Sequence, residues 1–201
     1  MTERLGIFGG SFSPPHAGHL YAADVFLHQM QLDKLLIIPA HVSPGKQEQK
    51  GISPEDRLAM CRLAFAGLPH TEVSDMEIRR GGQSYTVDTL QALAKPGRKL
   101  FVLCGTDTAL SLDRWHLPGV LFEMAEFVCI RRMDDPTFLQ RFDACNKQYA
   151  ARFGHTVTLL QAPAHPVSST AVRVALAAGK APSELAPEVL AYIKQNGLYR
   201  S

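Results

Sequence analysis

The stretch that decides the fold is LGIFGGSFSPPHAGHL, residues 5–20. Its apolar run at residues 5–8 predicts a buried strand, and the pair Gly9-Gly10 predicts a tight turn. A helix-like segment follows over residues 18–30. A strand that turns through glycine into a helix forms an anion site, because the free N–H groups and the dipole of the helix start point at one place. Glycine also lets the backbone approach closely, so we expect Gly9 and Gly10 to contact a phosphate.

Two histidines, His16 and His19, follow the glycines, and each ring adds a donor that can be charged or neutral near pH 7. The loop lacks the Gly-Lys-Ser/Thr of a Walker loop and the three-glycine spacing of a dinucleotide-binding fingerprint. A histidine pair at this spacing is also half of a zinc site, but no nearby Cys, His, Asp or Glu cluster supplies the missing ligands, so we expect no protein-held metal. The loop predicts a nucleotide-phosphate site built on histidines, with Ser11 bonding to the phosphate of either nucleotide.

Short apolar runs alternate with longer periodic segments along the chain, which is typical of βαβ units. The strands are predicted at residues 5–8, 34–38, 71–74, 99–104, 127–131 and 156–160. The helices are predicted at residues 18–30, 53–67, 86–94, 136–153, 169–178 and 187–196. The predicted fold is a doubly wound, mainly parallel α/β sheet with helices on both faces, whose ligands bind beyond the carboxyl ends of the strands. No linker divides the chain, so residues 1–201 are expected to form a single domain.

The composition excludes several classes of protein. With 46% hydrophobic and 20% charged residues over 201 positions, the chain is typical of a soluble protein with a full core. A net charge of +2 argues for neither nucleic acid nor an anionic membrane as partner. The four cysteines form no CxxC pair, which favours reduced thiols and a cytoplasmic location. We expect no signal peptide, because residues 1–4 lead straight into the first predicted strand and its phosphate loop. We expect no membrane span, since no apolar run approaches about 20 residues.

A second candidate phosphate site lies near the C-terminus, where Ser168-Ser169-Thr170 precedes a predicted helix. A hydroxyl residue at a helix start is an N-cap by default, but that role needs one residue and three stand in a row. Arg173 follows one turn into the helix, where a cation opposes the positive helix end unless an anion is bound. We expect these four residues to clamp the β- and γ-phosphates of a nucleoside triphosphate; a plain helix cap is the alternative.

The first loop resembles the HxGH phosphate loop of the nucleotidyltransferase superfamily, and the chain resembles bacterial nicotinate-nucleotide adenylyltransferases along essentially its whole length. The further matches are residues 39–46, Arg57 with Met60, Glu77, residues 83–90, Gly105-Thr106-Asp107, Trp115, Arg131, Ser168-Ser169-Thr170 with Arg173, Tyr192-Ile193 and Leu198-Tyr199. The first loop identifies only the superfamily, whereas the Ser-Tyr-Thr segment and the spacing from Gly-Thr-Asp to Trp115 point to the family. The resemblance implies a Rossmann-like nucleotidyltransferase fold.

Three positions depart from the pattern of that family. Ser13 stands where an Asp is usual, Gly45 where a His is common, and His116 where a Tyr is common. These changes leave the reaction class intact and concern the details of phosphate and pyridine contacts.

The resemblance implies that ATP and nicotinate mononucleotide react to give nicotinate adenine dinucleotide and pyrophosphate. The 5′-phosphate of the mononucleotide attacks the α-phosphorus of ATP and needs no general base, because it is already anionic at pH 7. Catalysis then consists of positioning and of neutralising charge. His19, aided by His16, is expected to donate to the α- or β-phosphate, and Arg173 to hold the leaving pyrophosphate. Mg²⁺ is expected to arrive on the ATP phosphates with few or no protein ligands.

Three residues are expected to complete the ATP side of the site. Lys46 lies in a loop from which it either reaches the phosphates or stays solvated. Gly105 and Asp107 follow a predicted strand at its carboxyl end, which suits contact with a ribose or the adenine nucleotide. Asp107 has an alternative role as the cap of a short following helix.

The mononucleotide side is expected to use Phe12, Thr86 and Trp115. Trp115 is the sole tryptophan, and residues 113–116 around it are polar and predict a loop. The resemblance implies that Trp115 stacks on the pyridine ring, while Thr86 and its neighbours offer backbone donors to the nicotinate carboxylate; a core position is the alternative for a lone Trp. Arg131 is assigned to the adenine side, with a surface ion pair as its alternative.

Other functions remain open at this point. The same reaction with nicotinamide mononucleotide is the nearest alternative, since a loop sequence does not reveal whether it binds a carboxylate or a carboxamide. HxGH enzymes that use CTP or phosphopantetheine have no obvious place for the Ser84–Thr86 and Trp115 features. A non-catalytic nucleotide sensor is a different class, against which the intact His16, His19 and Arg173 argue. Nucleic-acid binding is disfavoured, because no basic stripe interleaved with aromatics is present. The oligomeric state is left open.

Overall fold

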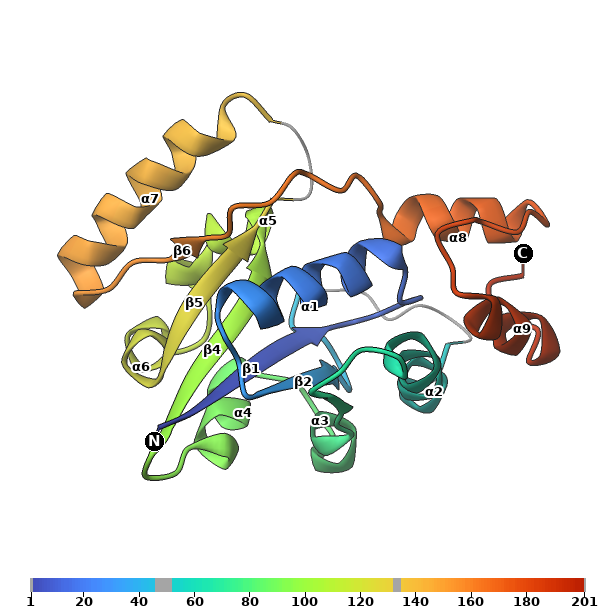
Figure 1. Cartoon of the computed structure of the whole chain (residues 1–201), viewed down its shortest axis with the longest axis horizontal. Coiled ribbons are helices and arrows are strands. Elements are labelled where there is room, and N and C mark those ends of the chain that lie inside the picture. The colour runs from blue at the N-terminus through green and yellow to red at the C-terminus, as the bar shows by residue number, and fades with distance from the viewer. Residues whose placement is uncertain (1, 46–51, 132–134, 201) are drawn as a thin grey trace.

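The computed structural model describes residues 2–45, 52–131 and 135–200. Within these ranges six strands form one sheet, with every neighbouring pair parallel, in the order β3-β2-β1-β4-β5-β6. The strands are β1 (Glu3–Gly10), β2 (Lys34–Pro39), β3 (Thr71–Val73), β4 (Arg98–Gly105), β5 (Ala125–Ile130) and β6 (Thr158–Leu159). The chain builds outward from β1 to β3 and then returns to place β4 on the other side of β1, so the topological switch point falls between β1 and β4 (Figure 1). The predicted doubly wound parallel sheet is confirmed.

Helices cover both faces of this sheet. In the described ranges they are α1 (Ala17–Gln29), α2 (Pro54–Phe65), α3 (Met76–Arg80), α4 (Thr86–Leu93), α5 (Thr106–Ala109), α6 (Pro118–Met124), α7 (Phe138–Phe153), α8 (Ser169–Ala177) and α9 (Pro187–Gln195), with a 3-10 turn at Leu112–Arg114. Buried residues of α1, α2, α8 and α9 form one core cluster with the sheet, and those of α4 to α7 form another. No helix in the described part of the chain is long and apolar enough to cross a membrane.

The two cores follow from the alternation of side chains along each strand. In β4, Phe101 and Leu103 belong to the cluster with α1, whereas Leu100 and Val102 belong to the cluster with α4. Successive side chains of a strand point to opposite faces, so a strand buried on both faces must be apolar at every position. This explains why the strands are continuous apolar runs in the sequence.

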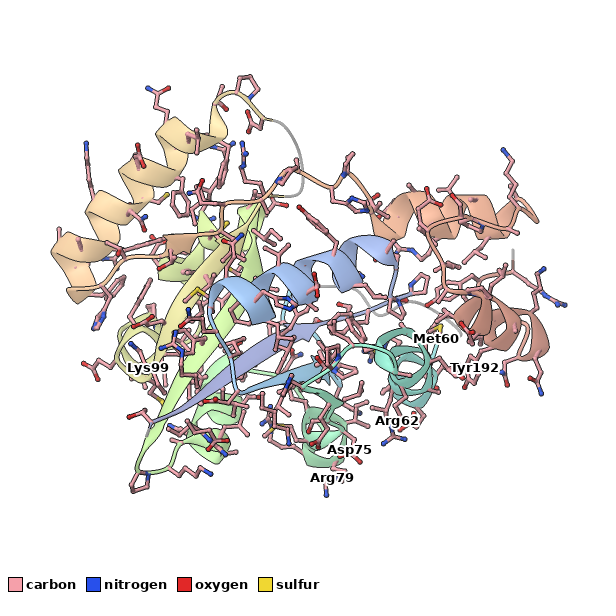
Figure 2. The ribbon with its side chains drawn as sticks, in the orientation of Figure 1. Met60, Arg62, Asp75, Arg79, Lys99 and Tyr192 are labelled. Carbon is pink, nitrogen blue, oxygen red and sulfur yellow. The ribbon has the colours of Figure 1, made fainter. Side chains whose placement is uncertain are left out.

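The start of α2 is fixed by a capping box that sequence inspection already predicts. The Asp56 N–H donates to Ser53 Oγ at 3.0 Å, and the Ser53 N–H donates back to the Asp56 carboxylate at 3.2 Å. The Tyr192 hydroxyl of α9 donates to the same carboxylate at 2.9 Å, close to Met60 of α2 (Figure 2). Partial burial raises the pKa of Asp56, but the hydrogen bonds from Ser53 and Tyr192 outweigh it and lower the pKa overall. The carboxylate therefore ties α2 to α9.

All six predicted strands and all six predicted helices are present, with ends within two residues of those expected. The sequence did not predict α3, α5, α6 or the 3-10 turn, because segments of three to seven residues are too short to show a helical period. The expected loop at residues 113–116 is partly wrong, since its first two residues belong to the 3-10 turn. The tight packing of this region against the sheet, with Leu112 fully buried, decides that conformation.

Candidate active site

A cavity of about 590 Å³ opens at the carboxyl ends of β1 and β4, at the switch point of the sheet. Its walls come from the β1–α1 loop, the segment after β2, the start of α2, the end of β4 with α5, Trp115 and the start of α8. The predicted site residues that line it are Gly9, Gly10, Ser11, Phe12, His19, Gly105, Asp107, Trp115, Ser168, Ser169, Thr170 and Arg173. The fold thus brings both predicted phosphate motifs to one cavity.

The two loop histidines occupy different positions at the start of α1. His19 lines the cavity, whereas His16, with an exposed fraction of 3%, lies behind it and its ring packs against that of His19 with centroids 3.8 Å apart. The backbone N–H of His16 donates to Nδ1 of His19 at 3.2 Å. Because a backbone N–H can only donate, Nδ1 of His19 is an acceptor and the ring proton lies on Nε2. His19 thus lines the cavity with its ring proton on Nε2, and the backbone N–H of His16 fixes that tautomer.

Phe12 lines the cavity but is almost completely buried. Its φ of 47° lies in the left-handed region, and its ring packs against those of Phe8, His19 and Phe65. The residue is 2% exposed, so it contacts the His19 ring and offers little surface to a ligand. A Cβ at Gly10 would lie 3.2 Å from the Phe12 ring, which explains the glycine at the end of β1.

The start of α8 carries the second phosphate motif. Ser168 is the N-cap, and its Oγ accepts from the Ala171 N–H at 3.2 Å. Arg173 donates to the Ser13 carbonyl at 2.8 Å and to Thr170 Oγ1 at 3.0 Å. Arg173 therefore spans from α8 to the β1–α1 loop, 160 positions earlier in the chain. The guanidinium is held at the meeting point of the two predicted phosphate sites.

Close packing joins the start of α1 to the segments on either side of α8. Ser169 Oγ donates to the Pro14 carbonyl at 3.3 Å, and the N–H of Ala17 donates at 2.8 Å to the carbonyl of Glu184, between α8 and α9. A Cβ at Gly18 would lie 3.2 Å from both the His16 ring and Val167 Cβ. Any larger residue at position 18 would therefore crowd the segment that leads into α8. The two motifs form one structural unit.

The opposite wall is formed by the end of β4. Gly105 is the N-cap of α5, and Asp107 lies inside that short helix, so the alternative role of Asp107 as the cap is wrong. Both residues line the cavity. Among its described lining residues Asp107 is the sole carboxylate, facing a wall that holds His19, Arg57 and Arg173. The charge distribution therefore favours an anionic ligand.

Trp115 is half-buried and lines the cavity while packing against the core on the α4 side. The ring of the next residue, His116, packs against that of Tyr85 at a tilt of 36°, with centroids 4.5 Å apart. Tyr85 is the N-cap of α4, but its side chain makes no cap hydrogen bond to the backbone at the start of that helix. His116 thus contacts the predicted carboxylate-binding loop through Tyr85.

Four predicted site residues are not among those that line the cavity. His16 lies behind His19, as described above. Thr86 is half-buried beside Tyr85, and Arg131 follows β5 outside the lining set. Lys46 lies outside the described residues, so its two roles stay predictions.

Sequence inspection missed the part played by Arg57, His41 and Ser43, all of which line the cavity. Arg57 is 8% exposed and donates to the carbonyls of Ser11, at 3.0 Å, and His41, at 2.8 Å. Ser43 Oγ lies 2.9 Å from Ser11 Oγ. A signal was present, because Arg57 falls at helical spacing on the same face as the buried Met60, Cys61 and Ala64. A charged residue on a core-facing stripe needs partners or a ligand.

No group of three or more His, Cys, Asp or Glu side chains placed to hold a metal ion occurs among the described residues. The lining of the cavity has one carboxylate in its described part, Asp107. This donor set suits a divalent cation that arrives already bound to phosphate oxygens, since Mg²⁺ in a protein-held site would need more oxygen ligands.

The strand order, the histidine loop and the second helix start together define a Rossmann-like nucleotidyltransferase. A family model described as cytidylyltransferase-like matches residues 7–175. The chain belongs to the family of nicotinate-nucleotide adenylyltransferases, which confirms the resemblance found in the sequence.

Similar proteins cover nearly the full chain. The nicotinate-nucleotide adenylyltransferase of Desulfatibacillum aliphaticivorans is 37% identical, over 98% of this chain and 99% of its own. That of Roseiflexus sp. (strain RS-1) is 38% identical, over 98% of each chain. The structure of Plasmodium falciparum nicotinic acid mononucleotide adenylyltransferase complexed with NaAD aligns with a TM-score of 0.75 at 18% identity, over 98% of this chain and 97% of its own. That likeness supports the fold.

Proposed function

We propose that this protein transfers the adenylyl group of ATP to the 5′-phosphate of nicotinate mononucleotide, giving nicotinate adenine dinucleotide and pyrophosphate in NAD biosynthesis. The observation that carries the proposal is the convergence of two helix starts and of His19, Arg57 and Arg173 on one cavity. Two phosphate-bearing substrates bring several negative charges to one place, and such a cavity neutralises them. Membership of the adenylyltransferase family supports the choice of substrates.

The arrangement suits in-line transfer without a covalent intermediate. The mononucleotide phosphate is the nucleophile and is anionic at neutral pH, so the chain needs no general base. The Nε2–H of His19 donates to a phosphate oxygen near the α-phosphorus, where charge develops, while Arg173 and the start of α8 hold the leaving pyrophosphate. Gly9, Gly10 and Ser11 contribute backbone and hydroxyl groups beside them.

Mg²⁺ enters this proposal as the ion that accompanies ATP. It would neutralise phosphate charge, and Asp107 is the one carboxylate that the described lining would offer to its hydration shell. Gly105 and Asp107 would then face the adenine nucleotide, and Arg131 is assigned to the same side.

The direct test is pyrophosphate release from ATP and Mg²⁺ with nicotinate or nicotinamide mononucleotide supplied side by side. The proposal requires release that depends on the mononucleotide and is faster with the nicotinate form. Equal rates, or a faster reaction with nicotinamide, would overturn the substrate and keep the reaction class. ATP binding without any release would instead identify a nucleotide sensor.

Trp115→Ala should raise the KM for nicotinate mononucleotide about tenfold, because an aromatic–ring stack is worth roughly 1–3 kcal/mol. The proposed contacts to the ATP phosphates come from the start of α8 and not from Trp115, so the KM for ATP should stay within about twofold. Steady-state kinetics with each substrate varied in turn gives both values. Trp115→Phe keeps a stacking ring and should recover most of the loss. An equal rise in both KM values would contradict stacking and assign Trp115 to folding.

A further inference from the structure

The segment after β2 forms one wall of the cavity, and its position is not set by the sheet. His41, Val42 and Ser43 all line the cavity. Val42 is joined to Gln83 by an isolated parallel bridge, so this wall lies directly beside the loop that leads into α4. The first segment lines the cavity, and the second leads to Thr86, which the resemblance assigns to the mononucleotide.

Ser84 connects these two segments with both its backbone and its side chain. Its N–H donates to the Val42 carbonyl at 2.9 Å, and its Oγ accepts from the His41 N–H at 2.9 Å. The Nδ1 of His41 donates to the Gly82 carbonyl at 3.1 Å, which adds a third link between the same segments. Ser84 is 8% exposed and does not itself line the cavity. Ser84 therefore holds residues that line the cavity without lining it itself.

A buried carboxyl group lies on the far side of Ser84. Glu77 of α3 is 6% exposed and accepts from Thr89 Oγ1 of α4 at 2.5 Å. Burial raises the pKa of Glu77, and the hydroxyls of Thr89 and Ser84, with Arg80, oppose that rise. Asp75, which precedes α3, pairs with Arg79 at 2.9 Å near the outer surface (Figure 2). Glu77 is thus the buried carboxyl of α3, bound by the Thr89 hydroxyl.

We propose that Ser84, backed by Glu77, is a positioning residue that locks the His41–Ser43 wall to the start of α4, so that both halves of the mononucleotide site keep one geometry. The inference rests on the proposed function for its substrate. A hydroxyl that accepts from His41 still has its proton to donate, and we assign the buried carboxyl of Glu77 as the acceptor of that proton. The Ser84 hydroxyl therefore fixes the His41–Ser43 segment, which belongs to no strand of the sheet, relative to α3 and α4.

The test compares Ser84→Ala with Thr89→Val. Ser84→Ala removes the acceptor for His41 and should raise the KM for the mononucleotide about five- to tenfold, the worth of one hydrogen bond, with the KM for ATP unchanged within about twofold. Thr89→Val breaks the other bond of the same carboxyl, so it should lower the melting temperature and leave both KM values unchanged. A KM for the mononucleotide that does not move in Ser84→Ala, or that rises equally in Thr89→Val, would overturn the proposal.

Glu77→Gln tests whether the carboxyl acts through Ser84. It should raise the same KM by less than Ser84→Ala does, and the double variant should be no worse than Ser84→Ala alone. If the increases in KM caused by the two single substitutions multiply in the double variant, the two residues act independently, which would overturn the proposed coupling.

A measurement without turnover separates this proposal from the proposed function. Amide hydrogen exchange at His41 should accelerate in Ser84→Ala and stay unchanged in Thr89→Val, because only the first removes the acceptor of that N–H. If the parent protein releases no pyrophosphate with either mononucleotide, the proposed function is wrong. The exchange rate at His41 still tests whether Ser84 holds the His41–Ser43 segment in place. Unchanged exchange in Ser84→Ala would overturn the lock even in an active enzyme.

Discussion

His19→Ala should lower kcat about 10²–10³-fold, because removing one preorganised donor to a developing charge costs roughly 2.7–4 kcal/mol. His19 lines the cavity, and its Nδ1 accepts from the His16 N–H, which leaves the ring proton on Nε2. The lost donor acts mainly on the transition state, so the KM for nicotinate mononucleotide should change less than about threefold. Steady-state kinetics with both substrates gives the comparison.

A matched control lies on the same helix. His28 is near the C-terminal end of α1, with a side chain 67% exposed and paired with Asp24. His28→Ala should leave kcat unchanged, since it removes a histidine from α1 without touching the cavity. Near-normal turnover in His19→Ala would refute the donor role, and an equal loss in His28→Ala would point to a disturbed α1.

Arg173→Ala should lower kcat/KM for ATP about a hundredfold, because a guanidinium makes charge-assisted hydrogen bonds worth roughly 1.5–3 kcal/mol. Its contacts with the Ser13 carbonyl and Thr170 Oγ1 hold it between the two helix starts. Since its proposed partner is the leaving pyrophosphate, product inhibition by pyrophosphate should weaken in the same variant. Arg173→Lys keeps the charge without the planar fork and should recover only part of the activity.

Arg98 provides the comparison that separates binding from folding. Like Arg173 it donates to a carbonyl, that of Leu93 at 2.8 Å, and its side chain is 16% exposed, but it pairs with Glu3 away from the cavity. Arg98→Ala should lower the melting temperature and leave kcat/KM for ATP unchanged. If Arg173→Ala loses stability to the same degree while pyrophosphate inhibition stays as in the parent, the clamp is wrong.

The local elements of this fold were predictable because their causes are local. Continuous apolar runs predict strands covered on both faces, and all six are found where expected. The capping box at the start of α2 and the left-handed Gly154, with φ of 73°, also lie where their side-chain chemistry places them. The short α3 and α5 were missed because their formation depends on packing against the sheet and on neighbouring loops.

The motifs of the candidate site could be predicted from the sequence, whereas several of the residues that line its cavity could not. The loop that bears His19 and the start of α8, which both line the cavity, each contain a recognisable phosphate-binding pattern, so each could be identified from its own residues. Arg57 and His41 have no such motif, and they enter the site through hydrogen bonds to segments far along the chain. Ser84 does not line the cavity, and it contacts the site through a hydrogen bond of the same kind, accepted from the His41 N–H.

By itself, the sequence determined where the strands and the longer helices form and which two segments are candidates for binding phosphate, because propensity, caps and helix dipoles act over a few residues. The tertiary structure alone decided that Arg173 meets the Ser13 carbonyl and that α8 joins α1 at one cavity. It also decided that His16 supports His19 from behind. Such pairings depend on strand order and on close packing between distant segments, whose free energy exists only once the whole chain has folded.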